Sequence, residues 1–335
     1  MISHEFDLKP YNTFGLNAKA AHFAAFSTKE ELSTILQQFP NEKLLVLGGG
    51  SNILFTEDYN GLVIKNEIKG FEILEENAQR AVVKVGAGEE WNEFVISCIR
   101  KGFAGVENLS LIPGSVGASP MQNIGAYGVE IKDVFQELEA YHIETGEIHT
   151  FDAVACEFGY RESVFKGKLK GQYIILTVTF LLTKNPNLNT SYGAIEFELK
   201  KMGVTKPTIK DISKAVIAIR NSKLPNPKII GNAGSFFKNP VVTDATVAEI
   251  KKTFPDIPNF PAENGMRKLP AGWLIEQAGW KGKTYNQYGV HKFQSLVLVN
   301  YGGATGNEIF RLSSRIIKDL EEKFGVTLER EVNVI

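Results

Sequence analysis

A serine at position 235 lies in a segment whose residue types could carry chemistry. The segment reads Gly231-Asn-Ala-Gly-Ser-Phe-Phe-Lys-Asn-Pro240. Its two glycines permit positive φ angles or a close approach to a ligand just before the serine. The result is a hydroxyl on an anchored but open loop, with Lys238 and Asn239 three and four residues further on. The same pattern is common in a strand that ends in a polar turn, so the segment alone assigns no catalytic role.

A second candidate is Gly48-Gly-Gly-Ser-Asn52, which directly follows the apolar run Lys43–Leu47. Consecutive glycines leave backbone N–H groups that can form a concave anion site, and a serine and an asparagine add donors. The segment matches neither the P-loop pattern nor the Rossmann pattern. Gly86-Ala-Gly88 has the first two Rossmann glycines, but Trp91 occupies the place of the third. Phosphate binding and a tight structural turn both remain open.

The stretch from Ser110 to Gly128 is the most unusual in the chain. Four glycines and two prolines in nineteen residues predict neither an ordinary helix nor a ladder of strands. Apolar residues such as Leu111, Ile112 and Val116 argue against disorder. We therefore expect an ordered loop that wraps around a large ligand.

Single charged residues elsewhere are less specific. Arg161 lies in Gly159-Tyr-Arg-Glu-Ser163, where a surface salt bridge is the ordinary alternative. Glu329 and Glu331 lie in an alternating terminal segment, whose glutamates would by default face solvent.

The elements that must position these residues follow from periodicity. We expect helices after Thr28, from Trp91 to Gly102, over Ile209–Ile219, over 243–254, around Ala271–Ala278, and from Thr305 to Gly325. We expect a buried strand over Lys43–Leu47 and further strands at 20–26, 62–65, 70–74, 81–85, 140–143, 173–180, 295–300 and 326–335. The segment Asn221–Pro227, with two prolines, is the best domain boundary.

Composition excludes several functional classes. The 335 residues carry a net charge of −1 with 22% charged and 43% hydrophobic residues, which favours neither nucleic acid nor an anionic membrane as partner. Two distant cysteines and five scattered histidines give no metal-binding spacing, so we expect no metal. The N-terminus lacks a secretory signal, and the longest apolar run is far shorter than the ~20 residues of a membrane span. The expected location is the cytoplasm.

Taken together, the segments resemble the UDP-N-acetylenolpyruvoylglucosamine reductases, flavoenzymes of peptidoglycan synthesis. The resemblance is nearly end to end, since several motifs occur in order at compatible spacing: Asn12–Gly15, Gly48–Asn52, Glu107–Gly117, Gln122–Gly128, Gly159–Ser163, Gly231–Pro240 and Ala271–Gly279. The Thr190-Ser-Tyr-Gly193 segment resembles the relatives that close a tyrosine loop over the substrate.

The resemblance implies an α+β protein with a vanillyl-alcohol-oxidase/PCMH-type FAD-binding fold of two subdomains and a third, α/β domain for substrate. The implied boundaries are 1–68 for the first subdomain, with 326–335 returning near the active site, 69–220 for the second, and 221–325 for the substrate domain. FAD is expected to be non-covalent, because Ser51 and Asn52 replace the covalently attached histidine of many related oxidases. The implied FAD-binding residues are Gly48, Gly49, Gly50, Ser51, Asn52, Ser110, Ile112, Pro113, Gly114, Ser115, Gly117, Gln122, Asn123, Gly125, Ala126 and Tyr127.

The implied reaction has two halves. NADPH gives a hydride to the flavin, which passes it to the terminal carbon of the substrate's enolpyruvyl ether. By resemblance, Arg161 stabilises the charge on the substrate carboxylate, Ser235 delivers a proton to Cα, and Glu331 orients or protonates the intermediate. Parity along a strand cannot separate Glu331 from Glu329, so resemblance alone selects Glu331. Many relatives carry a proline between the two glutamates, where this chain has Arg330.

By resemblance, the substrate-binding residues are Tyr192, Lys223, Asn239, Lys268 and Gln294, each of which could otherwise be a solvated surface residue. The expected partners are NADPH and the enolpyruvyl ether of UDP-N-acetylglucosamine. We expect the protein to be a monomer. The alternatives are another FAD-dependent sugar or lactone oxidoreductase of the same fold, and a non-catalytic module that binds flavin or UDP-sugar. The non-covalent first loop and the set of Arg161, Ser235 and Glu331 argue against both.

Overall fold

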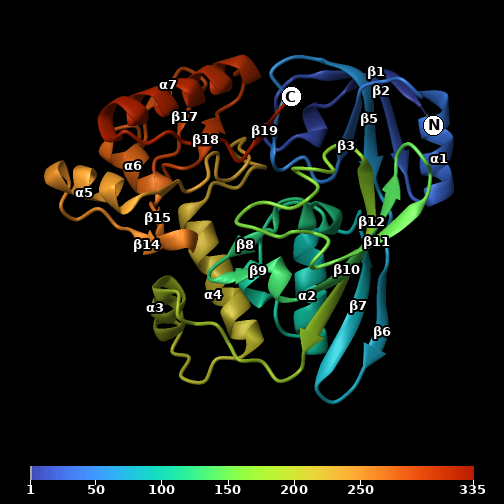
Figure 1. Cartoon of the computed structure of the whole chain (residues 1–335), viewed down its shortest axis with the longest axis horizontal. Helices are drawn as coiled ribbons and strands as arrows, with labels where there is room; N and C mark the ends of the chain where they lie inside the picture. The colour runs from blue at the N-terminus through green and yellow to red at the C-terminus, as the bar shows by residue number, and fades with distance from the viewer. Residues whose placement is uncertain (1) are drawn as a thin grey trace. The chain divides into compact units, whose positions relative to one another are not determined.

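The computed structural model describes residues 2–335, and the chain forms two compact units (Figure 1). Unit 1 contains the chain up to Phe6, Ala20–Gly49 and Asn60–Ser222, and unit 2 contains Asp7–Lys19, Gly50–Tyr59 and Lys223–Ile335. The division of the chain into three domains at 68 and 220 stays a prediction. No helix among the described residues combines the length and the apolar character that a membrane span needs.

A four-stranded sheet in unit 1 has the order β1-β2-β5-β3. Its strands are β1 (Ser3–Asp7), β2 (Lys19–Phe26), β5 (Tyr59–Asn66) and β3 (Leu44–Leu47). Helix α1 (Lys29–Gln38) begins as expected, with the Thr28 side chain accepting from the Glu31 N–H. The expectation that β3 is buried was wrong, because β3 is an edge strand and only Leu47 of its four residues is buried.

The second sheet of unit 1 is antiparallel, in the order β11-β10-β12-β7-β6. Its strands are β6 (Phe71–Glu76), β7 (Arg80–Gly86), β10 (Phe135–His142), β11 (Ile148–Asp152) and β12 (Tyr173–Thr183). Helix α2 (Trp91–Lys101) ends at Gly102 in the left-handed conformation, as predicted. It buries Trp91, Phe94 and Cys98 in the same cluster as Phe180 of β12.

The stretch from 105 to 133 forms short turns and one small hairpin. It contains the 3₁₀ turns η2 (Glu107–Leu109), η3 (Val116–Ala118), η4 (Pro120–Gln122) and η5 (Ile131–Asp133), and the hairpin β8 (Gly125–Ala126) with β9 (Val129–Glu130). This confirms that the stretch is ordered without being an ordinary helix or ladder. Unit 1 continues with α3 (Gly193–Lys201), which periodicity did not predict, and α4 (Ile209–Lys223), which runs into the segment expected to be a linker.

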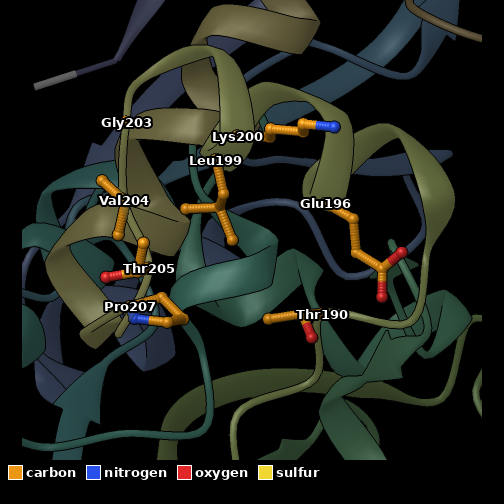
Figure 2. Close-up of a pocket in the computed structure, with 8 residues that line it drawn as sticks. All are labelled: Thr190, Glu196, Leu199, Lys200, Gly203, Val204, Thr205 and Pro207. Carbon is orange, nitrogen blue, oxygen red and sulfur yellow. The ribbon is translucent and has the colours of Figure 1, made fainter.

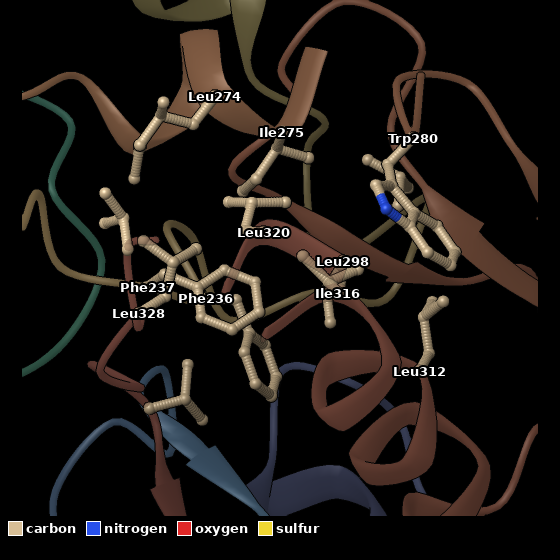
Figure 3. Packing of buried hydrophobic residues seen from close by; sticks show 14 of the residues in the cluster. Phe236, Phe237, Leu274, Ile275, Trp280, Leu298, Leu312, Ile316, Leu320 and Leu328 are labelled. Carbon is tan, nitrogen blue, oxygen red and sulfur yellow. The ribbon is translucent and has the colours of Figure 1, made fainter. Parts of the chain in front are cut away.

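Unit 2 packs three helices and several short strands around one core. The helices are α5 (Asp244–Thr253), α6 (Ala271–Gln277) and α7 (Gly306–Phe324), with the 3₁₀ turns η1 (Lys9–Tyr11) and η6 (Glu263–Gly265). The strands are β4 (Ile53–Leu54), β13 (Val241–Val242), β14 (Phe260–Pro261), β15 (Arg267–Lys268), β16 (Thr284–Tyr285), β17 (Tyr288–Val290), β18 (Leu298–Asn300) and β19 (Asn333–Val334). Figure 3 shows Phe236 and Phe237 among leucine and isoleucine side chains of α6 and α7.

The end of the chain differs from the continuous strand expected over 326–335. Strand β19 pairs with β4 in parallel, and Arg330 forms an isolated bridge with Phe237. The residues between make no continuous ladder. The capping box of α7 is confirmed, since the Thr305 hydroxyl accepts from the Glu308 N–H and the Glu308 carboxylate accepts from the Thr305 N–H.

Candidate active site

Two segments of unit 1 that are expected to bind the cofactor, one ending at Gly49 and one around Gly114, lie with their backbones in contact. A Cβ atom on Gly49 would lie 2.7 Å from the Gly114 Cα, and one on Gly48 would lie 2.5 Å from the Ser115 Oγ. A Cβ on Gly49 would therefore meet backbone, so that position in particular needs glycine. Glycine loops that meet in this way can present amide N–H groups to an anionic diphosphate.

The Ser110–Gly117 loop is anchored at both ends to neighbouring elements. The Gly114 carbonyl accepts a hydrogen bond from the Trp91 N–H at 3.0 Å, and the Gly117 N–H donates to the Ala87 carbonyl at 2.9 Å. A side chain on Gly117 would place its Cβ 2.5 Å from the Ala87 Cβ. The loop is therefore fixed by backbone contacts that tolerate no added atom at Gly117.

Two residues predicted to bind FAD have side chains that make hydrogen bonds to other residues of the protein. The Ser110 hydroxyl is 2.8 Å from the Ser213 hydroxyl of α4, and the Asn123 amide donates to the Gly159 carbonyl at 3.0 Å. Both side chains are completely buried. A cofactor contact from either residue would have to come from its backbone, so the two predictions rest on backbone groups.

Arg161 occupies a tight turn close to the predicted cofactor segment. Gly159 and Glu162 exchange backbone hydrogen bonds of 3.1 and 3.3 Å, and Arg161 between them has a φ of 56°. A positive φ on a bulky residue is a strained conformation, of the kind that concentrates at functional sites. The guanidinium donates to the Gly125 carbonyl at 2.5 Å. The structure thus brings Arg161 to the Gln122–Tyr127 segment.

Tyr127 connects the segment predicted to bind the cofactor with the segment that carries Tyr192. The two rings pack edge to face, with centroids 5.4 Å apart. The Tyr127 hydroxyl interacts with the guanidinium of Arg220 on α4, which also donates to the Leu111 carbonyl at 3.2 Å. Burial raises the pKa of Tyr127 and lowers the pKa of Arg220, while their mutual interaction opposes both shifts.

Sequence reasoning missed Arg220. The sequence did contain a clue to it. Arg220 follows the buried Val216 by four residues and therefore lies on the same side of the amphipathic helix. A buried guanidinium requires hydrogen-bond acceptors, so an arginine at such a position indicates polar partners inside the fold.

Two asparagines fix the root of the tyrosine segment. The Asn108 amide donates to the Tyr127 and Asn189 carbonyls, both at 3.0 Å. The Asn189 amide donates in return to the Gly128 carbonyl at 3.0 Å. Tyr192 itself is 53% exposed. The segment is therefore anchored at Asn189, while the tyrosine ring remains accessible to solvent.

In unit 2 the Ser235 segment pairs with the end of the chain. Phe237 and Arg330 form an antiparallel bridge. The Glu331 N–H donates to the Phe236 carbonyl and the Lys238 N–H donates to the Glu329 carbonyl, each at 2.9 Å. This register places Glu331 opposite Phe236, the neighbour of Ser235.

Both of the glutamates that parity could not separate are tied to other segments of unit 2. The Glu329 carboxylate lies 2.6 Å from the ammonium of Lys238, whose side chain is 8% exposed. The Glu331 carbonyl accepts from the side-chain amide of Asn52 at 3.2 Å, which ties the closing segment to the glycine loop. Glu329 is thus engaged in an ion pair with a buried cation.

The Asn12–Gly15 motif supports the serine loop. The Thr13 hydroxyl donates to the Asn232 carbonyl at 2.6 Å, and the Thr13 N–H donates to the Gly50 carbonyl at 3.0 Å. We expected Gly231 to leave room for substrate and flavin. The structure gives another reason, because a Cβ there would collide with the Phe14 carbonyl oxygen.

The predicted substrate residues of unit 2 differ in their contacts. The Asn239 side-chain oxygen accepts from the Ala271 N–H at the start of α6, at 2.9 Å. Lys268 lies in β15, between β13 and β14, and is half-buried. Lys223 is exposed at the end of α4, and Gln294 precedes β18.

A separate hollow of about 300 Å³ lies beside α3 in unit 1 (Figure 2). Leu199, Val204 and Pro207 line it together with polar side chains such as Glu196 and Thr190. None of the predicted site residues lines it. Among residues 2–335, no group of three or more His, Cys, Asp or Glu side chains could hold a metal ion.

Comparisons with known proteins agree over the whole chain. Residues 20–152 match the family described as "FAD binding domain", and residues 225–335 match "UDP-N-acetylenolpyruvoylglucosamine reductase, C-terminal domain". Curated proteins named UDP-N-acetylenolpyruvoylglucosamine reductase are similar along their full length. Those of Flavobacterium johnsoniae and Amoebophilus asiaticus are 53% and 51% identical, each covering 100% of this chain and 99% of the relative.

Two solved structures share the fold. The UDP-N-acetylenolpyruvylglucosamine reductase of Thermus caldophilus has a TM-score of 0.70 at 23% identity, covering 100% of this chain and 98% of that one. The 6-hydroxy-D-nicotine oxidase of Arthrobacter nicotinovorans has a TM-score of 0.51 at 13% identity, covering 98% and 86%. The α+β fold of the flavin-binding type predicted from the sequence is confirmed.

Proposed function

Because this chain belongs to the UDP-N-acetylenolpyruvoylglucosamine reductase family, we infer that it reduces the enolpyruvyl ether of UDP-N-acetylglucosamine to UDP-N-acetylmuramate. The reaction consumes NADPH, uses FAD and supplies a precursor of peptidoglycan. The observation that carries this conclusion is the identity of about half of all positions with named relatives over the full length of both chains.

The loops described above fit FAD. At the contact between Gly49 and Gly114 neither residue has a side chain. Backbone amides there can therefore approach a diphosphate. When bound, FAD would supply the hydride-transfer chemistry that links NADPH to the terminal carbon of the enolpyruvyl group. Gly48, Gly49 and the Ser110–Gly117 loop, all in unit 1, would hold the diphosphate.

Arg161 is proposed to stabilise negative charge on the substrate. Addition of hydride to the terminal carbon pushes electrons toward the substrate carboxylate, which needs a cationic partner at that moment. A guanidinium remains protonated throughout and matches a carboxylate with two parallel donors. Its strained backbone and its bond to the Gly125 carbonyl support a fixed position for this cation.

Ser235 is proposed to give the proton to Cα, with Glu331 as its partner. A neutral hydroxyl is a weak acid in water, so proton transfer from it requires a nearby group that orients or re-protonates it. The register that places Glu331 opposite Phe236 supports this pairing.

Tyr192, Lys223, Asn239, Lys268 and Gln294 are proposed to contact the UDP-sugar. The exposed Tyr192 ring, on a segment anchored at Asn189, supports a role for this segment in covering the substrate, as in relatives with a tyrosine loop. The side-chain oxygen of Asn239 bonds to the N–H at the start of α6. Its side-chain NH₂ can therefore donate to a ligand.

A two-step spectral assay tests the proposal. In the absence of oxygen, NADPH should bleach the flavin absorbance, and the enolpyruvyl UDP-sugar should restore it. In Ser235→Ala, bleaching should proceed at the parental rate, whereas restoration should slow by about a hundredfold or more because Cα loses its proton donor.

The control is Ser33→Ala, which removes a serine hydroxyl on α1, away from every proposed site residue. Restoration at the same rate in Ser235→Ala and the parent would remove Ser235 from the proton-donor role. Failure of the UDP-sugar to restore colour in the parent would contradict the activity itself.

A further inference from the structure

The segment that carries Glu331 is held by a short antiparallel bridge at Arg330 and, further on, by the parallel pairing of β19 with β4. Around Arg330 it pairs with the Ser235 segment only through this isolated bridge, in which Lys238 and Glu331 each donate one N–H. A short bridge of this kind fixes a strand weakly, so side chains must contribute to its position.

Arg330 supplies such a contact on the face away from Glu329 and Glu331. Alternate residues of an extended segment point to opposite faces, and the guanidinium of Arg330 reaches α7. Its Nε donates to the Ser313 Oγ at 2.8 Å, and one terminal nitrogen donates to the Ser314 Oγ at 2.7 Å. The guanidinium also lies over the Phe310 ring, 4.5 Å from its centroid.

The two serines are themselves oriented. Both hydroxyls donate to the Phe310 carbonyl, at 2.6 Å for Ser313 and 3.1 Å for Ser314. Their lone pairs therefore point to the guanidinium, and Ser313 is completely buried. A planar group that makes two directed bonds and one ring contact is restricted in translation and in rotation. Arg330 thus fixes its own backbone relative to the longest helix of unit 2.

We propose that Arg330 is a positioning residue for Glu331: by fastening the closing segment to α7, it sets the backbone from which the Glu331 carboxylate reaches the reacting atoms. The inference rests on the proposed role of Glu331. It assigns to Arg330 a function through its neighbour, with no contact of its own to substrate.

A double-mutant cycle on the two half-reactions tests it. Arg330→Ala should leave flavin reduction by NADPH within about twofold of the parent and slow re-oxidation by the UDP-sugar about tenfold to a hundredfold, because a displaced carboxylate loses its alignment. In a Glu331→Gln background the same change should cause no further slowing, since residues that act as one unit are not additive. Independently of activity, hydrogen exchange of the Glu331 amide should become faster in Arg330→Ala.

Matched variants guard against a general loss of structure. Arg315→Ala removes an exposed guanidinium of α7 that lies over Trp280 and Tyr285. This change should leave both half-reactions unchanged. The double change Ser313→Ala with Ser314→Ala removes the acceptors and keeps Arg330. It should slow re-oxidation as Arg330→Ala does, and it carries the test if Arg330→Ala does not fold.

Three outcomes would overturn the inference while the proposed function stands. They are equal slowing of both half-reactions, an additive effect in the Glu331→Gln background, and parental re-oxidation in both Arg330→Ala and the serine variant. If Glu331→Gln alone re-oxidises like the parent, the role of Glu331 is lost and the role of Arg330 is lost with it.

Discussion

At position 231 a missing side chain allows two distant backbone segments to touch. The Phe14 carbonyl occupies the space that a Cβ would need, and Gly231 exchanges backbone hydrogen bonds of 3.0 and 2.8 Å with Asn300. In the sequence, Gly231 was explained by backbone freedom beside Ser235. The structure shows instead that packing against Phe14 requires glycine there.

Replacement of Gly231 by alanine should therefore destabilise the protein by about 2 kcal/mol or more, because the Phe14 backbone cannot move without breaking other bonds. Urea denaturation of the parent and the variant measures this. The control is Gly279→Ala, where φ is 79° but open space surrounds the position, so only about 1 kcal/mol of backbone strain is expected. Equal losses in the two variants would contradict the packing explanation.

Residue types were more predictable than their environments. The order of glycines, serine and arginine identified the family, because such motifs reflect what a ligand requires. The pairing of Lys238 with Glu329 and the interaction of Arg220 with Tyr127 did not follow from the sequence, since both depend on which faces tertiary packing brings together.

At the scale of elements, strongly periodic helices were predictable and contact-dependent ones were not. Helices α2 and α7 have caps and apolar stripes that local sequence specifies, and both begin and end as expected. Helix α3 has a weak apolar pattern and begins at the tyrosine segment, so periodicity missed it. Strand β3 was expected to be buried, but its place at the edge of the sheet is a property of topology.

The tyrosine segment provides a prediction at this scale. Asn189→Ala removes the amide that donates to the Gly128 carbonyl, so the root of the segment should loosen while the core remains intact. The KM for the UDP-sugar should rise about threefold to tenfold with little change in kcat, since the loss falls on binding. Steady-state kinetics with varied substrate checks this.

Asn185→Ala, an exposed position earlier in the same connection, is the matched control and should behave like the parent. An unchanged KM in Asn189→Ala would show that the anchoring of this segment has no part in substrate binding.

At the scale of the whole molecule, the comparisons and the glycine loops agree on FAD, and the attachment of FAD can be tested directly. The purified protein should be yellow, keep its colour on dialysis and release free flavin when denatured by acid, since no covalent attachment is expected. Added FAD at about 100 times its Kd should stabilise the flavin-free protein by about 2.7 kcal/mol. A thermal melt with and without FAD measures this shift, and flavin that stays with the acid-denatured chain would contradict non-covalent binding.

Unit 2 is assembled from segments that lie far apart in the chain, and this has a consequence for its biosynthesis. Its early pieces, Asp7–Lys19 and Gly50–Tyr59, leave the ribosome long before Lys223–Ile335 exists. The Thr13 hydroxyl and its Asn232 partner are 219 positions apart, and Asn52 and Glu331 are 279 apart. Contacts so distant in sequence close late and slowly, whereas most of unit 1 is synthesised in one continuous stretch. The nascent chain must therefore keep two short amino-terminal pieces unpaired until translation has ended, a period in which chaperones would have their greatest effect on yield.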